Sequence, residues 1–156
     1  MSGSRTIDGE VSARDRRVAL VASRFNDLIV AALVKGASAT WLERGGAEDD
    51  LSVVRVPGAF ELPLAAARLA SSGRYDALVA LGCVIRGDTP HFEYVAGECA
   101  RGLQRAALDT GVPIAFGVLT VDTLEQARAR AAPGAGNKGA EAMDAALEMA
   151  ALLKRL

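Results

Sequence analysis

DALVALGCVIRGDTPHFEYV, residues 76–95, is the stretch from which we predict the fold. Its first half, residues 76–85, is a nearly continuous apolar run, which is typical of a parallel strand buried on both faces. A Gly-Asp-Thr-Pro corner follows, and a long amphipathic segment begins directly after it. A buried strand that leads at once into a helix predicts a βαβ unit.

Three other apolar runs of similar length predict the remaining strands, at residues 16–23, 50–57 and 113–120. Segments with helical periodicity follow the strands, so each connection is a crossover and the sheet is parallel. We expect a three-layer α/β/α sandwich around a four-stranded parallel sheet. The chain of 156 residues suits one domain, which we place at residues 16–156 after a polar N-terminal arm, residues 1–15.

Residues that favour helix ends predict where the helices begin. Asn26 is a suitable N-cap for the first helix, and Thr89 for the helix that follows residues 76–85. Asp122 with Glu125 resembles a capping box for a short helix after the fourth strand. We expect the last helix to begin near Lys138.

Composition and charge exclude several classes of function. A formal net charge of −1 provides no basic surface for nucleic acid or for an anionic membrane. No apolar segment is long enough for a signal peptide or a membrane span, so we expect a cytoplasmic protein. One histidine and two widely spaced cysteines, Cys83 and Cys99, offer no zinc ligand set, and we expect both thiols to be buried.

The carboxyl ends of parallel strands are where such sheets bind ligands. The corner at Gly87, Thr89 and Pro90 would leave free N–H groups at a helix N-terminus, which is a site for an anion. His91, the only histidine, would lie beside that anion with a pKa range suited to proton transfer. The alternative is a surface histidine bonded to a backbone group.

Other strand ends carry further candidates, each with a structural alternative. Glu61 and Phe60 follow the second strand and could contact a ligand or belong to a turn. Phe25 and Phe116 lie at or near strand ends and could stack on a heterocycle or belong to the core. Arg130, before the glycine-rich residues 132–139, could bind phosphate or lie beside a solvated loop.

Together, five motifs resemble the lumazine synthase family of riboflavin biosynthesis. They are SRFN (23–26), VPGAFELP (56–63), GCVIRGDTPHFEYV (82–95), FGVLT (116–120) and AGNKG (135–139), in that order and spacing. The resemblance covers about Arg16 to Leu153. It implies a flavodoxin-like fold and a transferase that needs no cofactor or metal. The implied reaction condenses 5-amino-6-ribitylaminouracil with 3,4-dihydroxy-2-butanone 4-phosphate to 6,7-dimethyl-8-ribityllumazine, with release of phosphate and water.

The resemblance also implies a role for each matching residue. His91 would transfer protons during the condensation, and Lys138 is a further candidate for the phosphate. The other residues would bind substrate: Phe25 on the pyrimidine; Ala59, Phe60 and Glu61 along the ribityl chain; the backbone of Cys83, Val84 and Ile85 at the ring edge; Asp88, Thr89 and Arg130 at the phosphate; and Phe116 in the pocket of the next subunit.

Homo-oligomers follow from the same resemblance. The family forms pentamers with active sites between neighbours, and some members stack twelve pentamers into an icosahedral 60-mer. Since no insertion precedes residues 135–139, we favour the 60-mer; the N-terminal arm could add a strand to a neighbour's sheet. Riboflavin synthase is a possible partner.

Two other kinds of protein remain open: a flavodoxin-like module that binds a flavin or lumazine without making it, and a structural shell protein. A dinucleotide-dependent dehydrogenase is disfavoured, because no GxGxxG follows the first strand.

Overall fold

The computed structural model describes residues 3–156 and contains, within them, one sheet of four parallel strands. The strands are β1 (Val18–Ser23), β2 (Leu51–Val56), β3 (Ala77–Ile85) and β4 (Ile114–Val121). Their order across the sheet is β2-β1-β3-β4. The four predicted strands are therefore confirmed, and the order is that of flavodoxin-like sheets.

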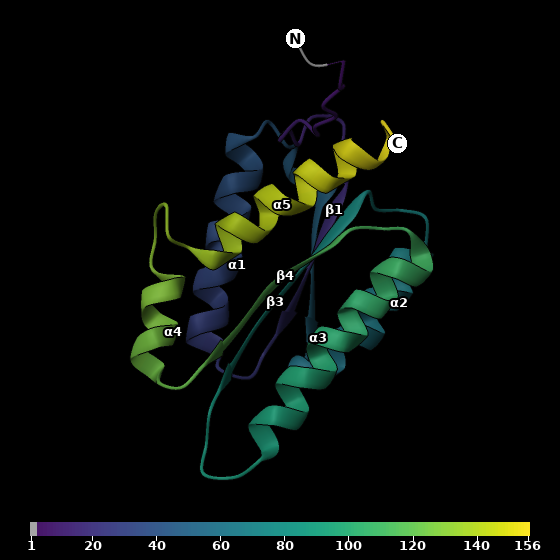
Figure 1. Ribbon diagram of the computed structural model, residues 1–156. Coiled ribbons are helices and arrows are strands. Elements are labelled where there is room, and N and C mark those ends of the chain that lie inside the picture. Colours follow the sequence, from purple (N-terminus) through teal and green to yellow (C-terminus); the bar gives the residue numbers. More distant parts are fainter. Residues whose placement is uncertain (1–2) are drawn as a thin grey trace.

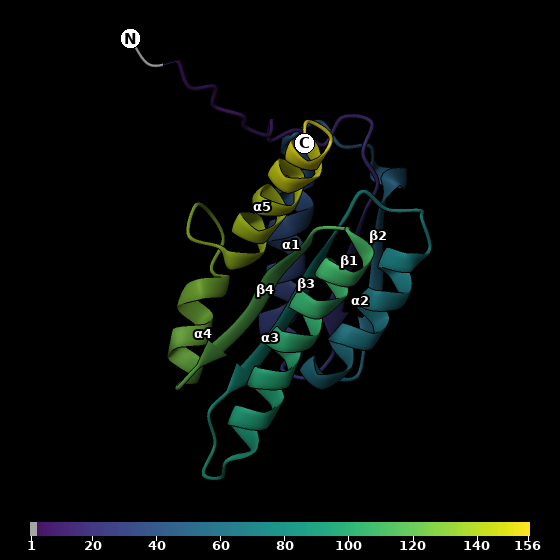
Figure 2. The ribbon, with the colours of Figure 1, turned by 45° about the vertical axis from the view of Figure 1, so that its right-hand side comes forward.

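Five α-helices in the described residues cover both faces of the sheet and make a three-layer sandwich (Figure 1). The helices α1, α4 and α5 pack on one face, and α2 and α3 on the other (Figure 2). Their bounds are α1 Asp27–Glu43, α2 Leu62–Ser71, α3 His91–Thr110, α4 Leu124–Ala131 and α5 Lys138–Leu153, with 3-10 turns η1 at Glu48–Asp50 and η2 at Ala59–Glu61.

Two apolar cores result from the alternation of side chains along the inner strands. In β1, Val18 and Leu20 face α1 and α5, whereas Ala19 and Val21 face α2 and α3. Trp41 of α1 is fully buried in the first core. Full burial of a large apolar side chain contributes about 1.5–3 kcal/mol, so these two layers supply most of the stability.

The outer strands correct the expectation that all four are buried on both faces. Side chains of β1 are buried throughout, but Val53 of β2 and Phe116 of β4 are each 48% exposed. Both strands are edges, so no neighbouring strand or helix covers their outer positions. Phe116 is the third residue of β4, opposite Ala80, so it lies near the start of the strand and not at its carboxyl end.

The predicted helix caps differ from the structure in detail. Asn26 is the N-cap residue of α1, as predicted, but its backbone has φ 62° and its side chain makes no capping hydrogen bond. The helix α3 begins at His91 with Pro90 before it, so the predicted N-cap Thr89 lies one position too early. The capping box of α4 is formed by Thr123 with Gln126, one residue later than Asp122 with Glu125. The two shifted starts, of α3 and α4, concern helix ends, where local sequence allows several starts.

Part of the N-terminal arm lies against the rest of the chain. Ala13 is buried in the core beside α1, and its N–H donates to the Arg44 carbonyl (3.0 Å). The guanidinium of Arg155 donates to the Asp8 carbonyl after α5. The arm forms no strand in residues 3–15, and no helix in the described chain is long and apolar enough to cross a membrane.

Asn137 and Gly139 let α1 and α5 pack closely. Asn137 is 1% exposed; its amide donates to the carbonyls of Ala32 and Ala131, and its oxygen caps α5 at Ala140. A Cβ at Gly139 would lie 2.1 Å from the Leu33 carbonyl oxygen. Since a backbone atom cannot move aside cheaply, this position requires glycine.

We therefore expect Gly139→Ala to destabilise the protein by about 1–3 kcal/mol, the usual cost of overpacking. Helix propensity alone would favour alanine by about 1 kcal/mol, so the sign of the change separates the two effects. Thermal unfolding of the variant measures it. Gly136→Ala is the matched control, because a Cβ there meets no atom within 4 Å. Equal stability of the two variants would contradict the packing argument.

Candidate functional site

The residues at the carboxyl ends of β1 and β3 form a hollow of about 170 Å³. His91, the first residue of α3, lies on its rim, and Phe25 lies in the loop after β1. Phe25 is 72% exposed, so it is free to stack on a ligand and is not part of the core. The lining consists of Phe25, Asn26, Ala59, Cys83, Val84, Ile85, Gly87, Thr89, His91, Phe92 and Val95.

Asn26 joins the two strand ends that form this hollow. Its side-chain amide donates to the Cys83 carbonyl in β3 (2.8 Å). Its backbone has φ 62°, a conformation that asparagine tolerates better than most residues. The N–H of Phe25 donates to the Pro57 carbonyl (3.1 Å), which ties the same loop to the end of β2. Three strand ends are thus held together around one opening.

The Cys83 thiol beside the hollow is not a nucleophile. Burial raises the pKa of Cys83 to about 11, because desolvation disfavours the thiolate. The thiol therefore stays protonated at neutral pH, and the same holds for Cys99, whose pKa burial also raises to about 11. Both cysteines are buried and free, as predicted.

His91 is exposed at the N-terminus of a 20-residue helix, where the helix dipole favours an anion. Within residues 3–156 its ring makes no hydrogen bond, so the alternative of a histidine bonded to a backbone group does not describe this structure. Its own N–H donates weakly to the Thr89 hydroxyl (3.4 Å). Both ring nitrogens are therefore available to a ligand in the hollow.

A second hollow, of about 450 Å³, lies along the edge strand β4 and shares no lining residue with the first. Phe116, Arg130 and Lys138 line it. The Arg130 guanidinium donates to the Gln126 carbonyl of its own helix (3.1 Å), and Lys138 pairs with Glu141 (2.9 Å). Two cations beside an exposed aromatic ring suit a ligand that carries an anionic group on a flat ring.

The structure therefore divides the predicted site residues among three places. The hollow at His91 also takes Phe25, Ala59, Cys83, Val84, Ile85 and Thr89. The hollow at β4 takes Phe116, Arg130 and Lys138. Phe60, Glu61 and Asp88 line neither hollow. Phe60 and Glu61 belong to η2 beside Ala59, and Asp88 lies exposed in the corner before α3.

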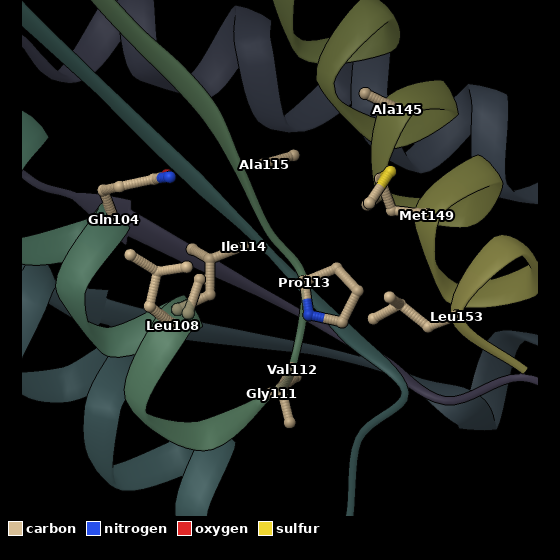
Figure 3. Close-up of a pocket in the computed structure, with 12 residues that line it drawn as sticks. Gln104, Leu108, Gly111, Val112, Pro113, Ile114, Ala115, Ala145, Met149 and Leu153 are labelled. Carbon is tan, nitrogen blue, oxygen red and sulfur yellow. The ribbon is translucent and has the colours of Figure 1, made fainter. Parts of the chain in front are cut away.

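The largest of these hollows, about 490 Å³, is unsuited to proton transfer (Figure 3). It lies where the C-terminal ends of α3 and α5 approach the start of β4, and Leu108, Met149 and Leu153 point into it. Gln104 is the one polar side chain in its lining, and no lining residue is titratable. An apolar hollow without an acid, base or cation can pack against another apolar surface, but it cannot transfer a proton.

In the described part of the chain, no three side chains of His, Cys, Asp or Glu gather where they could hold a metal ion.

Sequence reasoning missed two features of the site. It gave Asn26 a helix-capping role, whereas the side chain links β1 to β3 and lines the hollow. It also did not assign Phe92 and Val95 to the site, although both line the hollow. An asparagine in a tight strand-to-helix turn was an available signal, because such turns often need a positive φ.

The sequence model of the family described as 6,7-dimethyl-8-ribityllumazine synthase matches residues 15–154. The match spans nearly the whole chain and includes both hollows.

Asn26→Asp tests the link between β1 and β3. At neutral pH the new carboxylate would face the Cys83 carbonyl without a proton to donate, so we expect a loss of about 1–3 kcal/mol in stability. A protonated carboxyl regains an O–H donor, and the penalty on the carboxylate raises its pKa in the folded state above the unfolded value of about 4, so the deficit should shrink as the pH falls towards about 4. Thermal unfolding at neutral and acid pH measures this. Asn26→Gly, which never donates, should show a deficit that does not change with pH.

Proposed function

The chain belongs to the 6,7-dimethyl-8-ribityllumazine synthase family, and we propose that it condenses 5-amino-6-ribitylaminouracil with 3,4-dihydroxy-2-butanone 4-phosphate. The products are 6,7-dimethyl-8-ribityllumazine, phosphate and water. The protein would thus act as a transferase of riboflavin biosynthesis in the cytoplasm. The observation that carries the proposal is an unbonded imidazole, His91, on the rim of a hollow lined by Phe25 and the end of β3.

The first hollow supplies the place for the pyrimidine. Phe25 stacks on the ring, since it is exposed and lines the opening. The backbone from Cys83 to Ile85 lies at the ring's polar edge, and Ala59, Phe60 and Glu61 follow the ribityl chain along η2. The volume of about 170 Å³ suits one flat heterocycle with its chain projecting outward.

The corner from Gly87 to Pro90 supplies the place for the phosphate. Its exposed backbone N–H groups and the N-terminus of α3 favour an anion. Thr89 adds a hydroxyl, and Asp88 keeps its carboxylate outside the hollow. Arg130 provides the guanidinium that binds the leaving phosphate, with Lys138 beside it.

His91 then transfers protons between the two substrates. The substrate's 5-amino group attacks the ketone and one water leaves, which gives an imine. Loss of a proton and of phosphate then leaves an enol, which tautomerises to a carbonyl. The ribitylamino nitrogen attacks that carbonyl, and loss of a second water closes the ring. Each step moves a proton near neutral pH, and imidazole is suited to that range. The imine joins the two substrates to each other, so no enzyme lysine takes part as a nucleophile.

The separation of the two hollows supports a site made by two copies of the chain. Phe116 and Arg130 lie at an edge strand, away from the first hollow, so a neighbour can bring its own pair to His91. A head-to-tail contact of this kind closes into a ring, and we propose the pentamer, with twelve pentamers in a 60-mer. The neighbour also covers the apolar hollow in Figure 3, whose Leu108 is 74% exposed. Riboflavin synthase is a proposed partner.

The direct test is turnover by the purified protein. Incubation with both substrates should produce the absorbance and fluorescence of the lumazine. Binding of a flavin or lumazine without turnover would instead support a non-catalytic binding module, and assembly with neither would support a structural shell.

Two substitutions rank the contributions of His91 and Arg130 to the rate. Bringing the two substrates together can lower the activation barrier by about 7–11 kcal/mol. A general acid-base typically raises the rate by about 10²- to 10⁴-fold. We therefore expect His91→Ala to slow turnover without abolishing it, and Arg130→Ala to slow it more. Steady-state kinetics of both variants gives the ranking. Complete and equal loss in two folded variants would contradict it.

Mixed assemblies test whether two copies share each site. His91→Ala and Arg130→Ala chains, unfolded together and reassembled, would place an intact His91 beside an intact Arg130 in about a quarter of the sites. Activity should then exceed that of either variant alone. If both residues of a site come from one chain, mixing restores nothing.

A further inference from the structure

Arg86 lies between the two hollows, and the proposed function gives it no task. It is the first residue after β3, and its N–H donates to the Val121 carbonyl at the end of β4 (2.8 Å). It lines a shallow hollow that shares Phe92 with the His91 site, and Phe116 and Thr120 with the Arg130 site. Arg86 therefore lies between the His91 hollow and the Arg130 hollow of the same chain.

The Arg86 guanidinium contacts three side chains on two segments. Its Nε donates to Asp122 after β4 (2.8 Å), and its Nη1 donates to Glu93 in the first turn of α3. Its carbon atom lies 4.4 Å from the centroid of the Phe92 ring, a cation–π distance. One side chain thus connects the end of β4 with the turn of α3 that carries His91.

Other contacts around this corner are few. Gly87, Asp88 and Thr89 are exposed, and in the described chain their only hydrogen bond is the weak one at the Thr89 hydroxyl. Figures 1 and 2 show that the loop between β3 and α3 projects past the other elements at this end of the sheet. The three contacts of Arg86 therefore restrain the start of α3 together with the packing of Phe92 and Val95 against the core.

The pairing of Arg86 with Glu93 favours the charged form of both side chains. The pKa of Arg86 is raised, chiefly by its hydrogen bond to Asp122, and the pKa of Glu93 is lowered, chiefly by its hydrogen bond from Arg86. All three charged side chains are 47–64% exposed, and ion pairs so exposed contribute little to stability. Their value is geometric, because the planar guanidinium fixes two carboxylates at once.

We propose that Arg86 is a positioning residue, which holds His91 in its reactive place through Glu93 and Asp122. The proposal rests on the proposed function, since His91 must transfer protons for its position to matter. Arg86 contacts neither substrate in this account.

Arg86→Gln should lower kcat on the order of 10-fold, since a small misplacement of a catalytic group is costly, and change both KM values by less than about twofold. The matched control is Arg101→Gln, which removes an exposed ion pair with Glu98 further along the same helix. It should leave kcat unchanged. An unchanged kcat in Arg86→Gln, or an equal fall in the control, overturns the proposal.

Combination with His91→Ala separates positioning from a general structural effect. If Arg86 acts through His91, the double variant Arg86→Gln/His91→Ala should have the kcat of His91→Ala alone. A general effect on the fold would multiply the two losses, and that result overturns the proposal.

Hydrogen–deuterium exchange of the intact assembly tests the restraint without turnover. In Arg86→Gln, and in Asp122→Asn, the amides of residues 91–95 should exchange faster than in wild type, while in Arg101→Gln they should not. Unchanged exchange in the first two variants overturns the restraint. If the wild type forms no lumazine, the proposed function fails, and this exchange result alone decides whether Arg86 holds the start of α3.

Discussion

The pairing of β3 with a parallel strand on each side is the constraint on which this molecule depends. β3 lies between β1 and β4, and its residues are buried almost to its end. Because all the strands run the same way, their carboxyl ends meet at one edge of the sheet. The loops that carry Phe25, Ala59 and His91 all leave from that edge.

A buried sheet of this kind needs helices that approach it and each other closely. Alanine-rich helices and few aromatic residues make short distances possible, and Gly139 against the Leu33 carbonyl is the closest instance described above. Asn137 then satisfies the backbone groups that the close approach would leave unpaired. In the motif at residues 135–139, Asn137 and Gly139 are therefore buried and serve packing, whereas Lys138 is exposed.

The rigid layers contrast with the exposed corner that carries His91. Burial holds β3 in place, whereas residues 86–90 are exposed, and polar contacts together with the packing of Phe92 and Val95 orient the corner. Asn26 secures one side of the opening through Cys83, and Arg86 secures the other through Glu93 and Asp122. Both are single side chains that span two segments, which is an efficient way to place a reactive group with few contacts.

Periodicity and the five motifs determined the strands, the helices, the family and the separate candidate residues, because burial patterns and motif order are properties of the chain itself. They also predicted His91 at a helix start. Only the tertiary structure decided that Asn26 bonds to β3, that Phe116 lies within an edge strand and that Arg130 is apart from His91. These facts depend on which distant segments become neighbours, and packing between layers, not local pattern, sets that.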